Sequence, residues 1–213
     1  MVVPMGIPMR IGLLGPSDGD VASLGRASEF LLNGVKVHRA LYLGNDGALD
    51  RAVSAWARKL VGDNPSDDAA WLRAAEIALS GAPEQIDRFV VQERARQRLK
   101  ALAALPDGQG RTVEMLGDRV AVLIYDKAAL DEEDILGAGI LVYGKSEGPF
   151  VKRIGPRWFV SPGPIGCVGG GIAVIDDEGD DIRLQMYDSK GNATVQEVLS
   201  VARATKMIVQ GES

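Results

Sequence analysis

Acidic side chains on loops are the residues of this sequence whose type and spacing could do chemistry. Five of them follow predicted strands or lie in predicted turns, namely Asp18, Asp46, Asp63, Asp126 and Glu147. If these loops meet at the carboxyl edge of one sheet, their oxygen atoms together suit Mg²⁺ or Ca²⁺, which prefer hard oxygen ligands. The competing interpretation is that each carboxylate is solvated or caps a helix, as acidic loop residues usually are.

Histidine and cysteine, which supply most other catalytic and metal-binding groups, are scarce. His38 is the single histidine and lies in a predicted strand, and Cys167 is the single cysteine. No motif brings a histidine near Cys167, so a cysteine hydrolase is disfavoured. Residues 169–171 are three glycines that suggest a phosphate loop, but they precede a strand and lack the helix N-terminus that binds anions.

The composition indicates one globular domain. The chain has 213 residues, of which 46% are apolar and 25% are charged, with a net charge of -5. We expect a single domain over residues 9–213 after a disordered or extended lead-in at residues 1–8. The negative charge gives no reason to expect nucleic acid, and no apolar run approaches the roughly 20 residues of a membrane span. With one cysteine and no disulfide, a cytoplasmic location is expected.

Hydrophobic periodicity predicts a first half of strands alternating with helices and a second half rich in strands. Strands are expected at 10–14 and 35–43, and helices at 21–33 and 48–61. Two more helices, 66–80 and 84–105, form an insertion. Further strands are expected at 111–116, 119–125, 140–143, 150–154, 157–160, 171–177, 181–188 and 193–198, with helices at 127–135 and 200–210.

The strand and loop order resembles the calcineurin-like metallophosphoesterases of the compact bacterial and archaeal type. In that family an apolar strand ends in Gly-His-Thr-His, and the chain later turns at Asn-Pro-Gly-Ser. Here the strand 140–143 is followed by Gly-Lys-Ser-Glu at 144–147, and the later corner reads Ser-Pro-Gly at 161–163. The resemblance implies an α/β fold, a four-layer α/β/β/α sandwich of two mixed sheets, with a helical insertion at about 66–105.

The same resemblance implies that the two-metal site of the family has been lost. Proline at a ligand position offers no donor atom, and a neutral amide bridges two divalent cations poorly. One histidine cannot replace the three or four that the family uses. The resemblance therefore implies a degenerate member with no metal, no cofactor and no catalytic residue, whose former site comprises Pro16, Asp18, Asn45, Asp46, Asp63, Tyr125, Asp126, Lys145 and Glu147.

Three functions remain open. The first is a non-catalytic scaffold or regulator that binds a protein partner, since a fold and its activity are separable. The second is a phosphoesterase with an altered metal site of oxygen ligands. The third is a sensor of a small ligand in the old cleft, where Lys145 and Arg153 are available to an anion.

The insertion at 66–105 adds a surface that the compact enzymes lack. Its aromatic and arginine side chains are candidates for a protein interface, because these types are the usual interface anchors. The partner is another protein or a second copy of this chain. The competing interpretation is that the tryptophan is buried in the core and the arginines form a solvated face. The candidate residues are Trp71, Arg94, Arg96 and Arg98.

Overall fold

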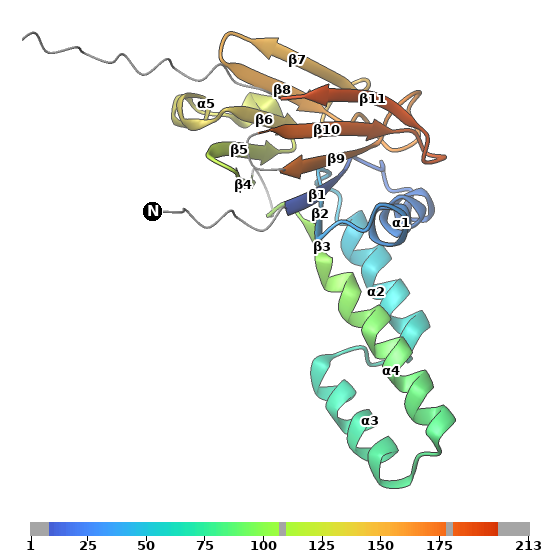
Figure 1. Cartoon of the computed structure of the whole chain (residues 1–213). Coiled ribbons are helices and arrows are strands. Elements are labelled where there is room, and N and C mark those ends of the chain that lie inside the picture. The colour runs from blue at the N-terminus through green and yellow to red at the C-terminus, as the bar shows by residue number, and fades with distance from the viewer. Residues whose placement is uncertain (1–8, 107–109, 178–180, 200–213) are drawn as a thin grey trace, which may run out of the picture.

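The structure is a computed structural model, and it describes residues 9–106, 110–177 and 181–199 (Figure 1). The predicted lead-in at 1–8 and the predicted helix at 200–210 lie outside these ranges. Within them the strands form two sheets, and helices α2, α3 and α4 extend away from the sheets as an arm (Figure 1).

The first sheet has six strands in the order β11-β10-β9-β1-β2-β3. Strand β1 (Met9–Leu14) is central, because it pairs in parallel with β2 (Arg39–Tyr42) and antiparallel with β9 (Ile172–Asp177). The remaining strands are β3 (Leu102–Ala104), parallel to β2, and the antiparallel pair β10 (Ile182–Tyr187) and β11 (Ala193–Val198).

The second sheet has five strands in the order β4-β5-β6-β8-β7. Its three inner strands are parallel and its two edge strands are antiparallel to their neighbours. The strands are β4 (Arg111–Leu116), β5 (Arg119–Ile124), β6 (Ile140–Tyr143), β7 (Phe150–Ile154) and β8 (Arg157–Ser161).

Alternating side chains of the buried strands separate the layers. Leu13 and Leu41 point into the core between the two sheets, whereas Leu14 and Tyr42, one residue later in each strand, point to the helices. This alternation is what the period of two in a strand requires.

Helices α1 (Val21–Glu29) and α2 (Ala48–Val61) cover the first sheet. Helix α5 (Glu132–Gly137) follows a short 3-10 turn, η3 (Lys127–Ala129), and the end of α5 leads to Ala138, which packs on the second sheet. The predicted four-layer sandwich of mixed sheets is therefore confirmed.

The end of the first helical segment differs from the prediction. The chain was expected to be helical to residue 33 and to stop at Gly34. Instead α1 continues as a π-helical turn, η1 (Phe30–Val35), and stops at Lys36, which adopts a left-handed backbone with φ 61°. A left-handed residue ends a helix by satisfying a carbonyl of its last turn, and the Lys36 N–H donates to Leu31. Strand β2 consequently begins four residues later than predicted, at Arg39.

The predicted helix at 84–105 also ends early. Helix α4 (Pro83–Arg98) gives way to a single 3-10 turn, η2 (Leu99–Ala101), and then to strand β3. Leucine and alanine favour helix locally. Here pairing with the open edge of β2 prevails, and the Leu105 N–H also donates to the Tyr42 carbonyl. The arm is thus the connection between two neighbouring parallel strands.

Helix α3 (Asp67–Ser80) begins at a well-formed cap. The Ser66 hydroxyl accepts from the Ala69 N–H, and two aspartates occupy the first turn, where they complement the helix dipole. Helix α4 packs against both α2 and α3. No helix of the described residues is long and apolar enough to cross a membrane.

Candidate functional site

Loops from both sheets meet at the carboxyl ends of the parallel strands, where the former metal site was predicted. The loop after β1 is joined to the loop after β8, because Gly15 donates to Gly171 at 2.9 Å and Ile165 donates to Pro16 at 2.7 Å. The loop after β6 is joined to the loop after β5, because Lys145 donates to the Tyr125 carbonyl at 2.8 Å. Backbone hydrogen bonds thus hold these loops to one another.

Two glycines let the loops touch. A Cβ atom at Gly15 would overlap the carbonyl oxygen of Gly163, and one at Gly144 would overlap the carbonyl oxygen of Leu43. The second contact joins a loop of one sheet to a loop of the other. Only glycine permits a backbone approach this close. The meeting point of the loops is therefore closed by backbone at these two places.

Tyr42 is the polar centre of the site. Its side chain is 0% exposed, and its hydroxyl lies 3.0 Å from the Ser17 backbone nitrogen and 3.0 Å from the Ser17 hydroxyl. The same hydroxyl donates to Asp46 at 2.9 Å. The Asp46 carboxylate also accepts from the Gly19 and Ala48 N–H groups at 2.9 and 3.0 Å. We call Tyr42, Ser17 and Asp46 the tyrosine network.

The tyrosine network shifts the pKa values of both its ionisable groups. Burial raises the pKa of Tyr42 above its usual value, so the phenol stays protonated and can donate. Burial also acts to raise the pKa of Asp46, but hydrogen bonds from Ala48, Tyr42 and Gly19 outweigh it and leave the pKa lowered. Asp46 is therefore an anion whose oxygens are already occupied by donors of the protein itself.

Lys145 forms an ion pair with Asp126. Lys145 therefore lies within reach of one acidic side chain of the predicted former site, Asp126. The side-chain hydrogen bond lowers the pKa of Asp126 and raises the pKa of Lys145. Asp126 also accepts from the Ala128 N–H at 3.0 Å and so caps the turn η3. The pair is mostly exposed, which places it at the rim of the site.

Some predicted site residues lie near one another, and others do not. Asn45, Tyr125 and Asp126 line a cavity of about 250 Å³. Pro16 is buried in the loop that carries it, while Asp18 and Glu147 are exposed. Asp18 adopts a left-handed backbone with φ 50°.

Two residues expected at the cleft lie elsewhere. Asp63 follows the end of α2, and a helix of that length carries the chain about 21 Å away from Asp46 at its start. Asp63 therefore lies away from the other residues of the predicted former site. Arg153 lies near the turn between β7 and β8, where its guanidinium is 5.8 Å from the centre of the Trp158 ring. The loop that carries Lys145 joins the opposite end of β7, at Phe150. Arg153 is therefore not placed to bind an anion together with Lys145.

The residues present do not fit a two-metal centre. In the described part of the chain no group of three or more histidine, cysteine, aspartate or glutamate side chains is placed to hold a metal ion. Asp46 is engaged by three donors and Asp126 by an ammonium. Two close divalent cations need several anionic or imidazole ligands that converge.

Sequence reasoning missed the tyrosine network. Tyr42 was counted as part of an apolar strand, and Ser17 as part of a turn. One signal was available, since a buried tyrosine needs a partner for its hydroxyl. A tyrosine at the end of a buried parallel strand therefore points to polar groups in the loops beside it.

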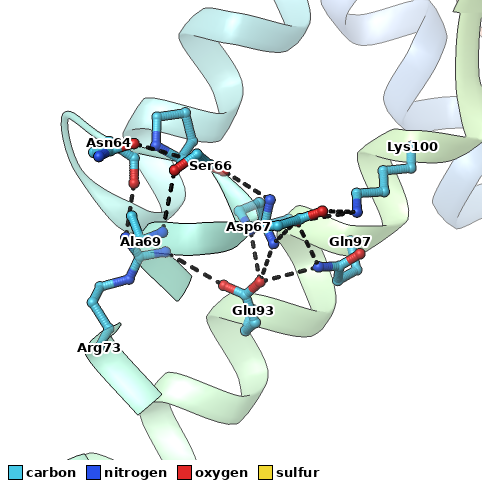
Figure 2. Close-up of polar contacts among 10 residues, drawn as sticks. Asn64, Ser66, Asp67, Ala69, Arg73, Glu93, Gln97 and Lys100 are labelled. Carbon is cyan, nitrogen blue, oxygen red and sulfur yellow. Dashed lines mark hydrogen bonds and ion pairs between the residues drawn. The ribbon is translucent and has the colours of Figure 1, made fainter. Parts of the chain in front are cut away.

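One residue of the arm that was predicted to lie at an interface, Arg96, is buried. Arg96 is 6% exposed, because it is surrounded by Glu93, Asp67 and the Pro65 carbonyl, with donor–acceptor distances of 2.7 Å to each. An arginine satisfied in this way joins α3 to α4 and is not a free anchor. Figure 2 shows Asp67 between the two helices, where Gln97 and Lys100 also reach it.

The other predicted interface residues are accessible. Trp71 is 76% exposed, so the interpretation that it is buried in the core is wrong. Arg94 is exposed. Arg98 is exposed in part, and its guanidinium donates to the Leu32 carbonyl of η1. Trp71 lies on α3, whereas Arg94 and Arg98 lie four residues apart on α4 and line the same hollow.

Comparisons with known proteins support the fold. No protein-family model and no curated protein matches the sequence. Among solved structures, the chain is similar to a predicted phosphoesterase from Streptococcus pneumoniae TIGR4, at 13% identity and a TM-score of 0.52, over 90% of this chain and 97% of that chain. It is also similar to Vacuolar Protein Sorting 29 from Cryptosporidium parvum, at 15% identity and a TM-score of 0.50, over 91% of this chain and 98% of that chain. The chain has a metallophosphoesterase-like fold, and its resemblance to the calcineurin-like metallophosphoesterases is confirmed at that level.

Proposed function

We propose that this protein is a non-catalytic metallophosphoesterase-like scaffold or regulator, which acts in the cytoplasm by binding another protein. The observation that carries the proposal is the tyrosine network. Asp46, which follows Asn45 in the chain, directs its oxygens to Tyr42 and to backbone N–H groups. Three donors occupy three of the roughly four lone-pair sites of this carboxylate, which leaves it little capacity to bridge two cations. The loops keep the architecture of a catalytic site and use its polar groups to hold themselves together.

A hydrolysis assay tests the loss of catalysis. The purified protein is incubated with aryl phosphomonoesters and phosphodiesters in the presence of Mn²⁺, Ni²⁺ or Mg²⁺, and we expect no turnover above buffer. Calorimetric titration of the same metals should give no saturable heat. Metal-dependent turnover that disappears in Asp18→Ala or Asp126→Ala would contradict the proposal and favour the altered oxygen-ligand site.

A capture experiment tests the binding function. The tagged full chain is used as bait and the proteins retained are identified by mass spectrometry. We expect a protein to be retained, whether a different protein or a second copy of the chain. Retention should survive EDTA, because the proposed scaffold holds no metal. If the chain retains no protein and instead turns over phosphoesters, it is an enzyme and not a scaffold.

The cavity beside Asn45 and Asp126 supports a second candidate, a sensor of a small ligand. Its volume of about 250 Å³ is slightly below the usual range for drug-sized ligands. A ligand that binds only the folded state raises the melting temperature progressively, roughly with the logarithm of its concentration. Thermal stabilisation without turnover, abolished by a larger side chain in Ala128→Phe, would favour the sensor. Ala128 lines the cavity and is exposed, so this substitution fills the cavity without disturbing the core.

A further inference from the structure

Two apolar hollows with basic residues at their rims lie on either side of α2. On one side of Trp56 and Leu60, α1 and α2 enclose a groove of about 470 Å³. On the other side, η1, α2 and α4 enclose a groove of about 210 Å³, and the same two side chains line it. The two hollows share Trp56 and Leu60 as lining residues, and we call them together the basic groove.

The charges around the basic groove are nearly all positive. Arg26 and Lys59 line the part between α1 and α2, and Arg94 and Arg98 line the part beside α4. Glu29 is the one acidic residue among the lining residues of these two hollows. The chain as a whole carries a net charge of -5. A basic groove on an acidic protein selects an apolar segment that carries negative charge.

Helix α3 carries a face of that kind. Its apolar side chains Trp71, Leu72 and Leu79 are 76%, 74% and 90% exposed. Trp71 and Leu72 are adjacent and Leu79 follows two helical turns later, so the three side chains lie toward one side of the helix. A contiguous apolar face left in solvent usually marks an interaction site. We call this the outer face of α3, and it comprises Asp68, Trp71, Leu72, Ala75 and Leu79, with Glu76 at its margin, where it also lines the hollow between α2, α3 and α4.

The charged members of the outer face are both acidic. Asp68 and Glu76 are exposed, whereas Arg73, the single basic residue of α3, is directed to α4, where it lies 3.6 Å from Glu93. The opposite face of α3, which includes Ala70, packs within the arm. Because α3 uses that face against its own α4, its outer face points away from its own basic groove. Only another molecule can bring the two surfaces together.

We propose that the outer face of α3 of one copy occupies the basic groove of a second copy. The two surfaces match in character, since each presents an apolar strip with charge of one sign at its edges. The mode of contact is that of an amphipathic helix in a hydrophobic groove. The contact joins two unlike surfaces, so a two-fold pair makes it twice, whereas a head-to-tail arrangement closes into a ring or extends into a filament. It uses none of the loops at the former metal site and does not depend on whether they are catalytic.

Charge reversal in the full chain tests the contact. Association is measured by sedimentation equilibrium up to about 200 µM, the range in which contacts of modest area are populated. The wild type should associate with concentration, and less so in high salt, which screens charge pairs. Reversing the groove in Lys59→Glu/Arg94→Glu should raise the dissociation constant by about tenfold. Reversing the helix in Asp68→Lys/Glu76→Lys should do the same.

Mixing the two variants gives the decisive result. Each variant repels its own copies, but the acidic helix of one fits the basic groove of the other, and the reversed helix fits the reversed groove. The mixture should therefore associate to within about threefold of the wild type. Arg58→Glu is the matched control, because Arg58 precedes Lys59 on α2, is exposed and does not line either hollow. It should leave association unchanged.

An apolar variant guards against an effect of net charge. Leu79→Ser removes the most exposed leucine of the outer face, with little effect on folding, and should also weaken association by about tenfold. Far-UV circular dichroism checks that each variant is folded. A wild type that stays monomeric throughout, or a mixture that associates no better than its components, would overturn the proposal. Retention of a different acidic protein by the basic groove in place of a second copy would overturn it as well.

Discussion

The former metal site and the arm each bury a polar side chain that is hydrogen-bonded within the protein, but the arm also exposes large apolar side chains. At the site, Tyr42 is fully buried and its hydroxyl is bonded within the protein, to Ser17 and to Asp46. In the arm, the apolar side chains of Trp71 and Leu79 are exposed, and the long polar side chain of Arg96 is the buried one. Polar groups therefore stabilise both regions internally, and the arm in addition presents the large apolar side chains of α3 to solvent.

The difference indicates which region is available for a partner. A buried polar group that already has its hydrogen bonds loses free energy if a ligand displaces them. Exposed apolar side chains gain free energy, about 25 cal/mol per Å², when a partner covers them. The loops of the former site thus favour their present arrangement, whereas the outer face of α3 favours association. Four substitutions or conditions test this contrast, from the largest expected effect to the smallest.

Removal of the Tyr42 side chain should have the largest effect. Tyr42→Ala leaves a cavity in the core between the first sheet and α2 and also breaks the tyrosine network. We expect a loss of about 4 kcal/mol in the free energy of unfolding, measured by urea denaturation. Tyr42→Phe keeps the ring but leaves the Ser17 N–H and Asp46 without this partner, and should cost about 2 kcal/mol. Tyr125→Phe is the control at the same site, because its ring is only half-buried. If Tyr42→Phe costs no more than Tyr125→Phe, the network does not hold the loops.

Removal of the buried guanidinium in the arm should come next. Arg96→Met preserves the length of the side chain and leaves Glu93, which is 17% exposed, with only the more distant Arg73 at 3.6 Å as a charge partner. Breaking a buried ion pair from one side costs about 3 kcal/mol. Hydrogen exchange should show this loss in the amides of α3 and α4 and not in the sheets. Arg94→Met on the exposed face of the same helix is the control, with a change within about 0.5 kcal/mol. Equal effects of the two substitutions would show that Arg96 does not join the helices.

Acid should weaken the arm in a defined range of pH. Side-chain hydrogen bonds from Lys100 and Arg96 lower the pKa of Asp67 from 3.8 to about 2 in the folded protein. Because the folded pKa lies below the unfolded one, Asp67 contributes its full stability above about pH 4 and loses it as the pH falls through about 2. Urea denaturation at a series of pH values should show this loss. Asp67→Asn should remove that part of the pH dependence, and Asp68→Asn should leave it intact. An unchanged profile in Asp67→Asn would rule out this carboxylate as its source.

Removal of the rim ion pair should have the smallest effect. Lys145 is 60% exposed and Asp126 is 28% exposed, so solvent screens much of their attraction. Lys145→Ala should leave the urea midpoint unchanged within error, as should Asp126→Asn, with Lys152→Ala on the exposed strand β7 as control. A loss comparable to that of Tyr42→Phe would mean that the rim pair, and not the tyrosine network, holds the loops together.

Much of the sheet structure was predictable, because local signals and long-range packing agree there. Strands β4, β6, β7 and β11 have the bounds that alternation and turn residues predict. Strand β3 was not predictable, since Leu102–Ala104 has the composition of a helix. Its conformation depends on the free edge of β2, which is about 60 residues away in the sequence. No window of local sequence contains that information.

The candidate site was predictable in its location and not in its contacts. The loops that carry Asn45, Asp126 and Lys145 follow the ends of parallel strands, and the resemblance placed them together. Which donors each carboxylate accepts from depends on distances between loops, which sequence spacing does not specify. The exposure of the outer face of α3 could not be predicted, for a related reason. An amphipathic pattern predicts that a helix has an apolar side, but not whether the protein's own core or another molecule covers it.

The pairing of β1 with β9 has a consequence for the order in which the chain folds. The ion pair between Arg10 of β1 and Asp176 of β9 joins residues 166 positions apart. A ribosome that adds about 5–20 residues per second needs roughly 10–30 s to synthesise the intervening chain. During that time β1 can pair with β2, but its other edge stays open. Contacts of such long sequence separation also slow folding from the unfolded state. The nascent N-terminal half is therefore the stage at which this protein is most exposed to aggregation and most dependent on chaperones.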